Sequence, residues 1–173
     1  LLKSGRMKDI LIAKMENKIN VEDNLVTLIS KIGEKITLRR CDFIGEEKFL
    51  NFSYIHSALK KNIGKIGVLV SLKTTKSKDK LLQFGKQLCM HIAALSPLAI
   101  DKEGLNKNIL IKEKEIITEE LKNSGKDSII VDKIAAGKLN KFINDNTLLN
   151  QEWVIEPKKK VKEALKNAAG KDK

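Results

Sequence analysis

The residues best suited to chemistry lie in one short segment, Ser53 to Ser57, which holds two serines, a tyrosine and His56. A nucleophilic enzyme pairs a Ser or Cys with a base, and an acidic side chain orients that base. Neighbouring residues of an extended segment point to opposite faces, and no Asp in this segment could orient His56. The pattern therefore favours a polar residue on a sheet face that also holds Phe52 and Tyr54, and it leaves a role for His56 in a site open.

The remaining candidates for metal or phosphate chemistry are weak. Cys89 and His91 are two residues apart in a helical pattern, so they point about 200° apart and cannot share an ion. A phosphate-binding loop needs a Gly-rich turn followed by Lys-Ser/Thr at the start of a helix. The Gly-Lys-Ile-Gly segment at 64–67 lacks both features and predicts a hairpin turn with close backbone packing. We therefore expect no metal, no cofactor and no enzyme.

Hydrophobic periodicity predicts an α+β fold, with antiparallel sheet elements packed with helices. Strands gather in the first half and helices in the second, which argues against alternating βαβ units. Residues 147–155 are predicted to be extended or irregular. The predicted helices are 1–17, 20–33, 79–95, 108–123, 128–144 and a last one that begins at Pro157; the predicted strands are 36–40, 49–58 and 65–73, of which the last two form an antiparallel hairpin.

These elements predict two small lobes and a tail. The first lobe, residues 1–75, is a partial one that holds a helix and the antiparallel strands. The second lobe, residues 76–157, is helical. The tail, residues 158–173, is rich in lysine and has a net charge of +5.

The composition is that of a globular protein, with 42% hydrophobic and 32% charged residues. No apolar stretch approaches the ~20 residues that span a bilayer, so we expect no membrane contact. Two cysteines without a CxxC spacing indicate thiols in a reducing cytoplasm, although a mitochondrial matrix is not separable from it. The net charge of +12 suggests an anionic partner, yet the lysines are dispersed and lack interleaved aromatic residues, which argues against a dedicated nucleic-acid role.

Seven short phrases, in one order along the chain, resemble those of the bacterial elongation factor Ts family. The first, at 31–40, is similar to "K-I-G-E-N-I-x-x-R-R", and the segment 148–154 is similar to "L-L-x-Q-x-F-V". Between them lie phrases similar to "Y-x-H" (54–56), "I-G-V-L-V" (66–70), "M-H-x-A-A-x-x-P" (90–97), "S-G-K-P" (124–127, with Asp127 in place of Pro) and "E-K-M-x-x-G-R-x-x-K-F" (132–142).

The resemblance implies a guanine-nucleotide exchange factor that binds elongation factor Tu in its GDP-bound and nucleotide-free states and promotes GDP release without a cofactor. The partner-binding residues that it implies are Ile32, Gly33, His56, Val154 and Ile155, with His91 as a weaker candidate. For Val154 and Ile155, composition alone leaves open whether the side chains are exposed for docking or buried in the core.

The sequence also departs from the family pattern. It contains no "T-D-F-V" segment and no small helical domain ahead of one, and the Gly-Glu-containing final strand is missing. The first residue is Leu, so we expect a core fragment in which docking is retained and exchange is impaired. The alternative function is a basic RNA-binding module of the translation machinery, and among assemblies a homodimer is left open.

Overall fold

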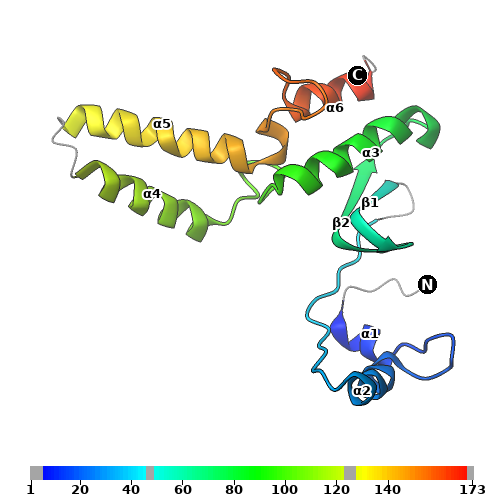
Figure 1. The fold of residues 1–173 in the computed structure, drawn as a ribbon. Coiled ribbons are helices and arrows are strands. Elements are labelled where there is room, and N and C mark those ends of the chain that lie inside the picture. Colours follow the sequence, from blue (N-terminus) through cyan, green and yellow to red (C-terminus); the bar gives the residue numbers. More distant parts are fainter. Residues whose placement is uncertain (1–5, 46–48, 123–127, 171–173) are drawn as a thin grey trace. The chain divides into compact units, whose positions relative to one another are not determined.

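The computed structural model describes residues 6–45, 49–122 and 128–170 (Figure 1). In it the chain divides into two units. Unit 1 is Leu1–Glu47 and unit 2 is Lys48–Lys173. The predicted division at residue 75 differs from this one, because the helix that follows residue 75 packs on the strands that precede it. The α+β class is confirmed: the described residues form helices and one two-stranded antiparallel sheet.

Unit 1 is built around helix α2 (Val21–Ile32), whose two ends match the sequence signals. The Asn20 side chain accepts a hydrogen bond from the Asp23 backbone N–H at 2.7 Å, which caps the first turn. Gly33 ends the helix in a left-handed conformation with φ of 76°, which a residue without a side chain adopts at no steric cost. Residues 1–5 of the predicted helix over 1–17 lie outside the described residues. Within residues 6–17 the helix is α1 (Met7–Ile12), which packs on α2.

The predicted strand over 36–40 is wrong. These residues have no regular structure, Ile36 is half-buried, and its neighbours are exposed. An isolated extended segment gains no ladder hydrogen bonds, so an alternating pattern makes a strand only where a partner strand is present. The described part of unit 1 offers none.

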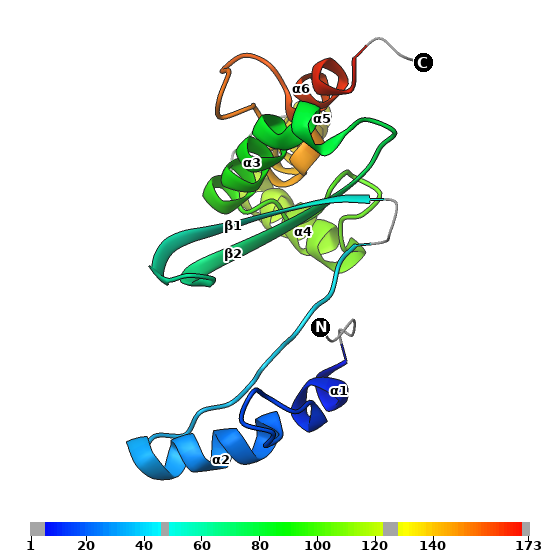
Figure 2. The ribbon, with the colours of Figure 1, turned by 90° about the vertical axis from the view of Figure 1, so that its right-hand side faces the viewer.

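Unit 2 begins with the predicted hairpin, β1 (Phe49–Lys60) and β2 (Ile63–Lys73), which is confirmed as antiparallel. The turn is Lys61-Asn62, where Asn62 has a positive φ of 64° that asparagine tolerates well. Helix α3 lies over one face of the hairpin (Figure 2), and that face is apolar. That face holds Phe52, Val68 and Val70, which are buried, and Leu50, Tyr54 and Leu72, which are half-buried.

Helix α3 (Lys78–Leu95) lies across this apolar face. Leu81 and Leu88 are buried against the hairpin at helical spacing. Between them, Gly85 allows close approach: a Cβ at Gly85 would lie 2.5 Å from Phe52 Cε1. The helix backbone therefore rests directly on the Phe52 ring.

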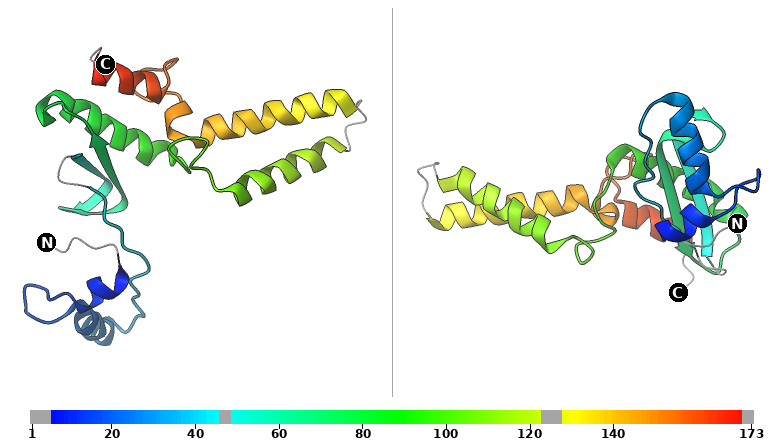
Figure 3. Two further views of the ribbon diagram at one scale, coloured as in Figure 1. Left: turned by 180° about the vertical axis from the view of Figure 1, so that it is seen from behind. Right: turned by 90° about the horizontal axis from the view of Figure 1, so that it is seen from below.

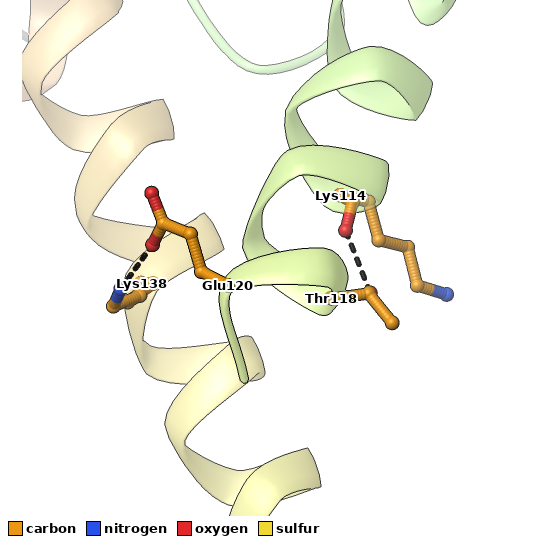
Figure 4. A network of polar contacts seen from close by, with 4 residues as sticks. All are labelled: Lys114, Thr118, Glu120 and Lys138. Atoms are coloured by element: carbon orange, nitrogen blue, oxygen red, sulfur yellow. Dashed lines mark hydrogen bonds and ion pairs between the residues drawn. The ribbon is translucent and has the colours of Figure 1, made fainter. Parts of the chain in front are cut away.

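Helices α4 (Lys107–Lys122) and α5 (Ser128–Asn146) form an antiparallel pair, seen side by side in Figure 3. Buried Ile117, Leu121 and Ile143 belong to this pair. An exposed ion pair joins Lys138 Nζ to Glu120 Oε2 at 2.6 Å across it (Figure 4), and such a pair contributes at most about 1 kcal/mol. Apolar burial between the helices is the larger contribution.

The chain ends in a 3-10 turn, η1 (Leu148–Asn150), and helix α6 (Val161–Ala169). The predicted last helix is confirmed, but it begins at Val161, and it occupies most of the stretch predicted to be a Lys-rich tail. Val161 and Ala164 are buried in the same core as the hairpin and α3. Their spacing gives α6 one apolar face, so this stretch is anchored although it is rich in lysine.

Replacing Gly85 with Ala should destabilise unit 2 by about 1–3 kcal/mol, because the new methyl group overlaps the Phe52 ring. Gly137 in α5 is the matched control, since nothing lies within 4 Å of its Cβ position. Gly137→Ala should be neutral or stabilising by up to about 1 kcal/mol. Urea denaturation of both variants measures the difference, and equal effects would mean that Gly85 is not a close-contact site.

Candidate functional site: an apolar groove beside His56

A cavity of about 470 Å³ lies where the hairpin, α3 and the segment after η1 meet. We call it the His56 groove. Its walls are mainly apolar, and four of the apolar side chains remain 42–48% exposed: Ile66, Met90, Val154 and Ile155. The lining residues are Tyr54, His56, Ile66, Met90, His91, Ala93, Ala94, Val154 and Ile155.

The hairpin supplies the first wall. His56 pairs with Ile66 in the sheet register and is exposed, and the Tyr54 hydroxyl lies 3.1 Å from His56 Nδ1. This hydrogen bond restricts the imidazole orientation. Directly after His56, Ser57 has a positive φ of 50° and the register shifts beyond Ala58. Such an irregularity bends the strand and directs the side chains next to it.

Gly64 explains how the two strands approach each other beside His56. A Cβ at Gly64 would lie 2.8 Å from the His56 carbonyl oxygen. The prediction of close backbone packing at 64–67 is therefore confirmed, although these residues open β2 and the turn itself is Lys61-Asn62.

The second wall is the segment after η1, which Trp153 anchors. Trp153 is 4% exposed, and its ring lies 5.8 Å from the Phe84 ring and 5.2 Å from the His91 ring. Its backbone N–H donates to the Lys159 carbonyl at 2.7 Å, and its own carbonyl accepts from the Glu156 N–H. The resulting turn leaves Val154 and Ile155 facing solvent, which settles the question that their composition left open.

His91 lies at the base of the groove and is fully buried on α3. Its Nε2 lies 3.1 Å from the Gln151 side-chain oxygen, and the Val154 N–H donates to its Nδ1 at 3.4 Å. Gln151 in turn donates to the Asp145 carbonyl at 2.8 Å, so its side-chain oxygen faces His91 as an acceptor. This set of partners requires the neutral imidazole with its proton on Nε2.

Burial lowers the pKa of His91 from its ordinary value of 6.5, because desolvation disfavours the imidazolium, and the hydrogen bond that His91 donates to Gln151 opposes this shift. His91 is thus an internal link between α3 and the groove wall. Cys89, also fully buried, has its thiol pKa raised to about 11 by desolvation. A thiol of such pKa is a poor nucleophile at neutral pH.

The structure brings together three of the five predicted partner-binding residues: His56, Val154 and Ile155. Ile32 and Gly33 lie in unit 1, at the end of α2, where Ile32 is 53% exposed and Gly33 has no neighbour around its Cβ position. Sequence reasoning missed Met90, Ala93 and Ala94 as groove residues. The phrase "M-H-x-A-A" contains all three. The sequence signal that could have identified Met90 is its position as an apolar residue outside the apolar stripe of the predicted helix.

Three features of the groove are common on surfaces that bind other proteins. It combines exposed apolar side chains, a polar group held in place by a neighbour, and a rigid buried base. Among the described residues, no three His, Cys, Asp or Glu side chains converge as a metal ion would require. Nor does any described helix have the length and apolar character needed to cross a bilayer.

Comparisons with known proteins identify the family of this chain. The family model described as Elongation factor TS matches residues 2–172. Elongation factor Ts of Nitrobacter hamburgensis is 35% identical over 170 residues, which cover 98% of this chain and 55% of that protein. Elongation factor Ts of Xanthobacter autotrophicus is 38% identical (96% and 54%), and that of Rickettsia prowazekii is 37% identical (91% and 51%).

The chain therefore belongs to the elongation factor Ts family. The match begins at residue 2, so it extends well ahead of residue 31, where the resembling phrases start. The chain spans about half the length of the curated relatives it matches.

Acidification should weaken unit 2 through His91. The folded pKa is lowered, so between 6.5 and that lower value the unfolded state binds more protons than the folded state. The free energy of unfolding should be constant above about pH 7 and fall as the pH drops below 6.5. Urea denaturation between pH 5 and 8 measures it. His91→Gln should lose this contribution and His56→Gln should keep it; the same pH profile in both variants would contradict the assignment.

Proposed function

We propose that this chain docks on elongation factor Tu through the His56 groove and has the role of promoting GDP release, with exchange impaired in these 173 residues. It acts as a binding factor in the cytoplasm with no catalytic chemistry of its own. One observation carries the proposal: His56, Val154 and Ile155 come from distant parts of the sequence and line a single groove. The family resemblance names these same residues as partner contacts. Ile32 and Gly33 stay predicted contacts of unit 1.

The apolar side chains supply the affinity in this proposal. Met90, Val154 and Ile155 expose apolar area that a partner would remove from water, at roughly 25 cal/mol for each Å² buried. His56 supplies direction, because the Tyr54 hydroxyl holds its Nδ1 and leaves Nε2 available for a partner acceptor or donor. Burial of the groove base keeps this geometry rigid, so that little ordering cost accompanies docking.

Exchange follows from a difference in affinity. A factor that binds nucleotide-free elongation factor Tu more tightly than the GDP complex must, by reciprocity, weaken GDP binding by the same factor. Coupling of this kind is typically about 1–3 kcal/mol. These 173 residues contain no "T-D-F-V" segment, so we expect docking with little acceleration of release.

Ile155→Ser should weaken docking on elongation factor Tu at least about tenfold, because it removes exposed apolar contact area from the groove. Ile111→Ser is the matched control: Ile111 is 54% exposed on α4, outside the groove, against 44% for Ile155. Calorimetry measures the affinity, and release of a fluorescent GDP analogue measures exchange. Wild-type binding without accelerated release is the expected result; absence of binding by the folded chain would contradict the proposed function.

Tyr54→Phe should weaken docking by about threefold, less than His56→Ala, because it removes one hydrogen bond to His56 and keeps the ring. Ser71→Ala is the control for loss of a hydroxyl on the same hairpin, where Ser71 bonds the Asn51 side chain at 2.7 Å. Full affinity in Tyr54→Phe, with a loss in His56→Ala, would show that Tyr54 does not position His56.

A further inference from the structure

A second surface of unit 2 is strongly basic. Residues 73–80 hold four lysines and one acidic residue, and α6 adds two lysines and one Glu. By contrast, the pair α4 and α5 holds seven lysines and six acidic residues over a longer stretch. We call the first set the lysine patch: Lys73, Lys76, Lys78, Lys80, Lys162 and Lys166.

The tertiary structure joins the two segments of the patch. A Cβ at Gly170, which caps the end of α6, would lie 2.5 Å from Lys76 Nζ. Lys76 thus reaches from the loop after β2 to the end of α6. On α6, Lys162 and Lys166 are one turn apart, and Gly170 follows Lys166 by four residues. Lysines far apart in the sequence therefore gather at one end of unit 2.

These charges are not neutralised within the described part of the chain. The ion pairs there use Arg6, Lys138 and Lys159, and none uses a lysine of the patch. Five of the six patch lysines are exposed, and Lys76 is half-buried. Clustered cations raise the local potential, so this end of unit 2 attracts polyanions.

We propose that the lysine patch binds the phosphate backbone of RNA. The patch is made of lysines, which contact phosphates as point charges, and its two segments contain no Trp, Tyr, Phe or Arg. Protein interfaces are enriched in aromatic residues and Arg and depleted in Lys, which disfavours an acidic protein as the partner. The lack of aromatic residues also excludes base stacking on the patch, so binding is independent of base sequence. RNA is the polyanion that we propose as the source of these phosphate groups, because translation elongation, the process in which this family acts, uses RNA.

The patch lies apart from the His56 groove. Lys80 and Met90 are ten residues apart on α3, about 15 Å along the helix axis. Docking of a protein in the groove and of RNA on the patch can therefore occur together, and the two proposals fail independently.

The test measures binding of the whole chain to a fluorescent 20-base-pair RNA hairpin of arbitrary sequence, by anisotropy across a salt series. Six phosphate contacts give a slope of about −5 when the logarithm of the binding constant is plotted against the logarithm of the salt concentration. The triple variant with Lys78, Lys80 and Lys166 changed to Gln should bind at least tenfold more weakly, with a slope near about −3. The matched control changes Lys112, Lys114 and Lys133 on α4 and α5 to Gln; it removes the same charge and should bind like wild type.

Several outcomes would overturn the proposal. Equal losses in the two triple variants would mean that net charge alone, and no patch, attracts the RNA. Tighter binding of a poly-glutamate peptide than of the hairpin would assign the patch to an acidic protein. A DNA duplex of the same length should bind within a few-fold of the RNA, and a tenfold preference for DNA would exclude RNA as the intended polyanion. Circular dichroism checks that the variants keep α6 folded.

Discussion

The close packing of α3 on the β1–β2 hairpin is the contact on which the rest of unit 2 depends. Gly85 has no side chain, so the helix backbone reaches the Phe52 ring, and Leu81 and Leu88 are buried on either side. A regular helix resting on a paired hairpin has few ways to move without opening this core. One contact therefore sets the separation of groove residues on the hairpin from those on the helix.

The irregular segment after η1 needs a different kind of support, because its backbone pairs only through an isolated antiparallel bridge between Glu152 and Lys160. Trp153 provides apolar burial, and neutral His91 provides directional hydrogen bonds to Gln151 and Val154. A buried polar group with satisfied partners specifies one arrangement, whereas apolar packing alone would allow several. The consequence is a wall whose outward side chains stay apolar and exposed, as the proposed docking on a partner requires.

The charge of the molecule is distributed unevenly between its surfaces. Residues 1–47 hold nine basic and eight acidic residues, so nearly all of the net +12 belongs to residues 48–173. Within those residues, the walls of the His56 groove are mostly apolar, and the lysine patch lies toward the other end of α3. An apolar groove and a basic patch on one helix allow two partners of different chemistry to be recognised without competition.

Elements whose boundaries depend on capping residues or on hydrophobic spacing within a few residues could be predicted from the sequence alone. The cap at Asn20, the stop at Gly33 and the helical stripe of α3 depend on neighbours within a few residues, so pattern reading located them. The strand predicted at 36–40 failed because a strand depends on a partner that no local pattern reveals. The anchoring of α6 by Val161 and the exposure of Val154 became clear only from the tertiary structure. Core space is limited, so the burial of one side chain excludes its neighbours. Here Trp153 is buried in the core and Val154 remains exposed.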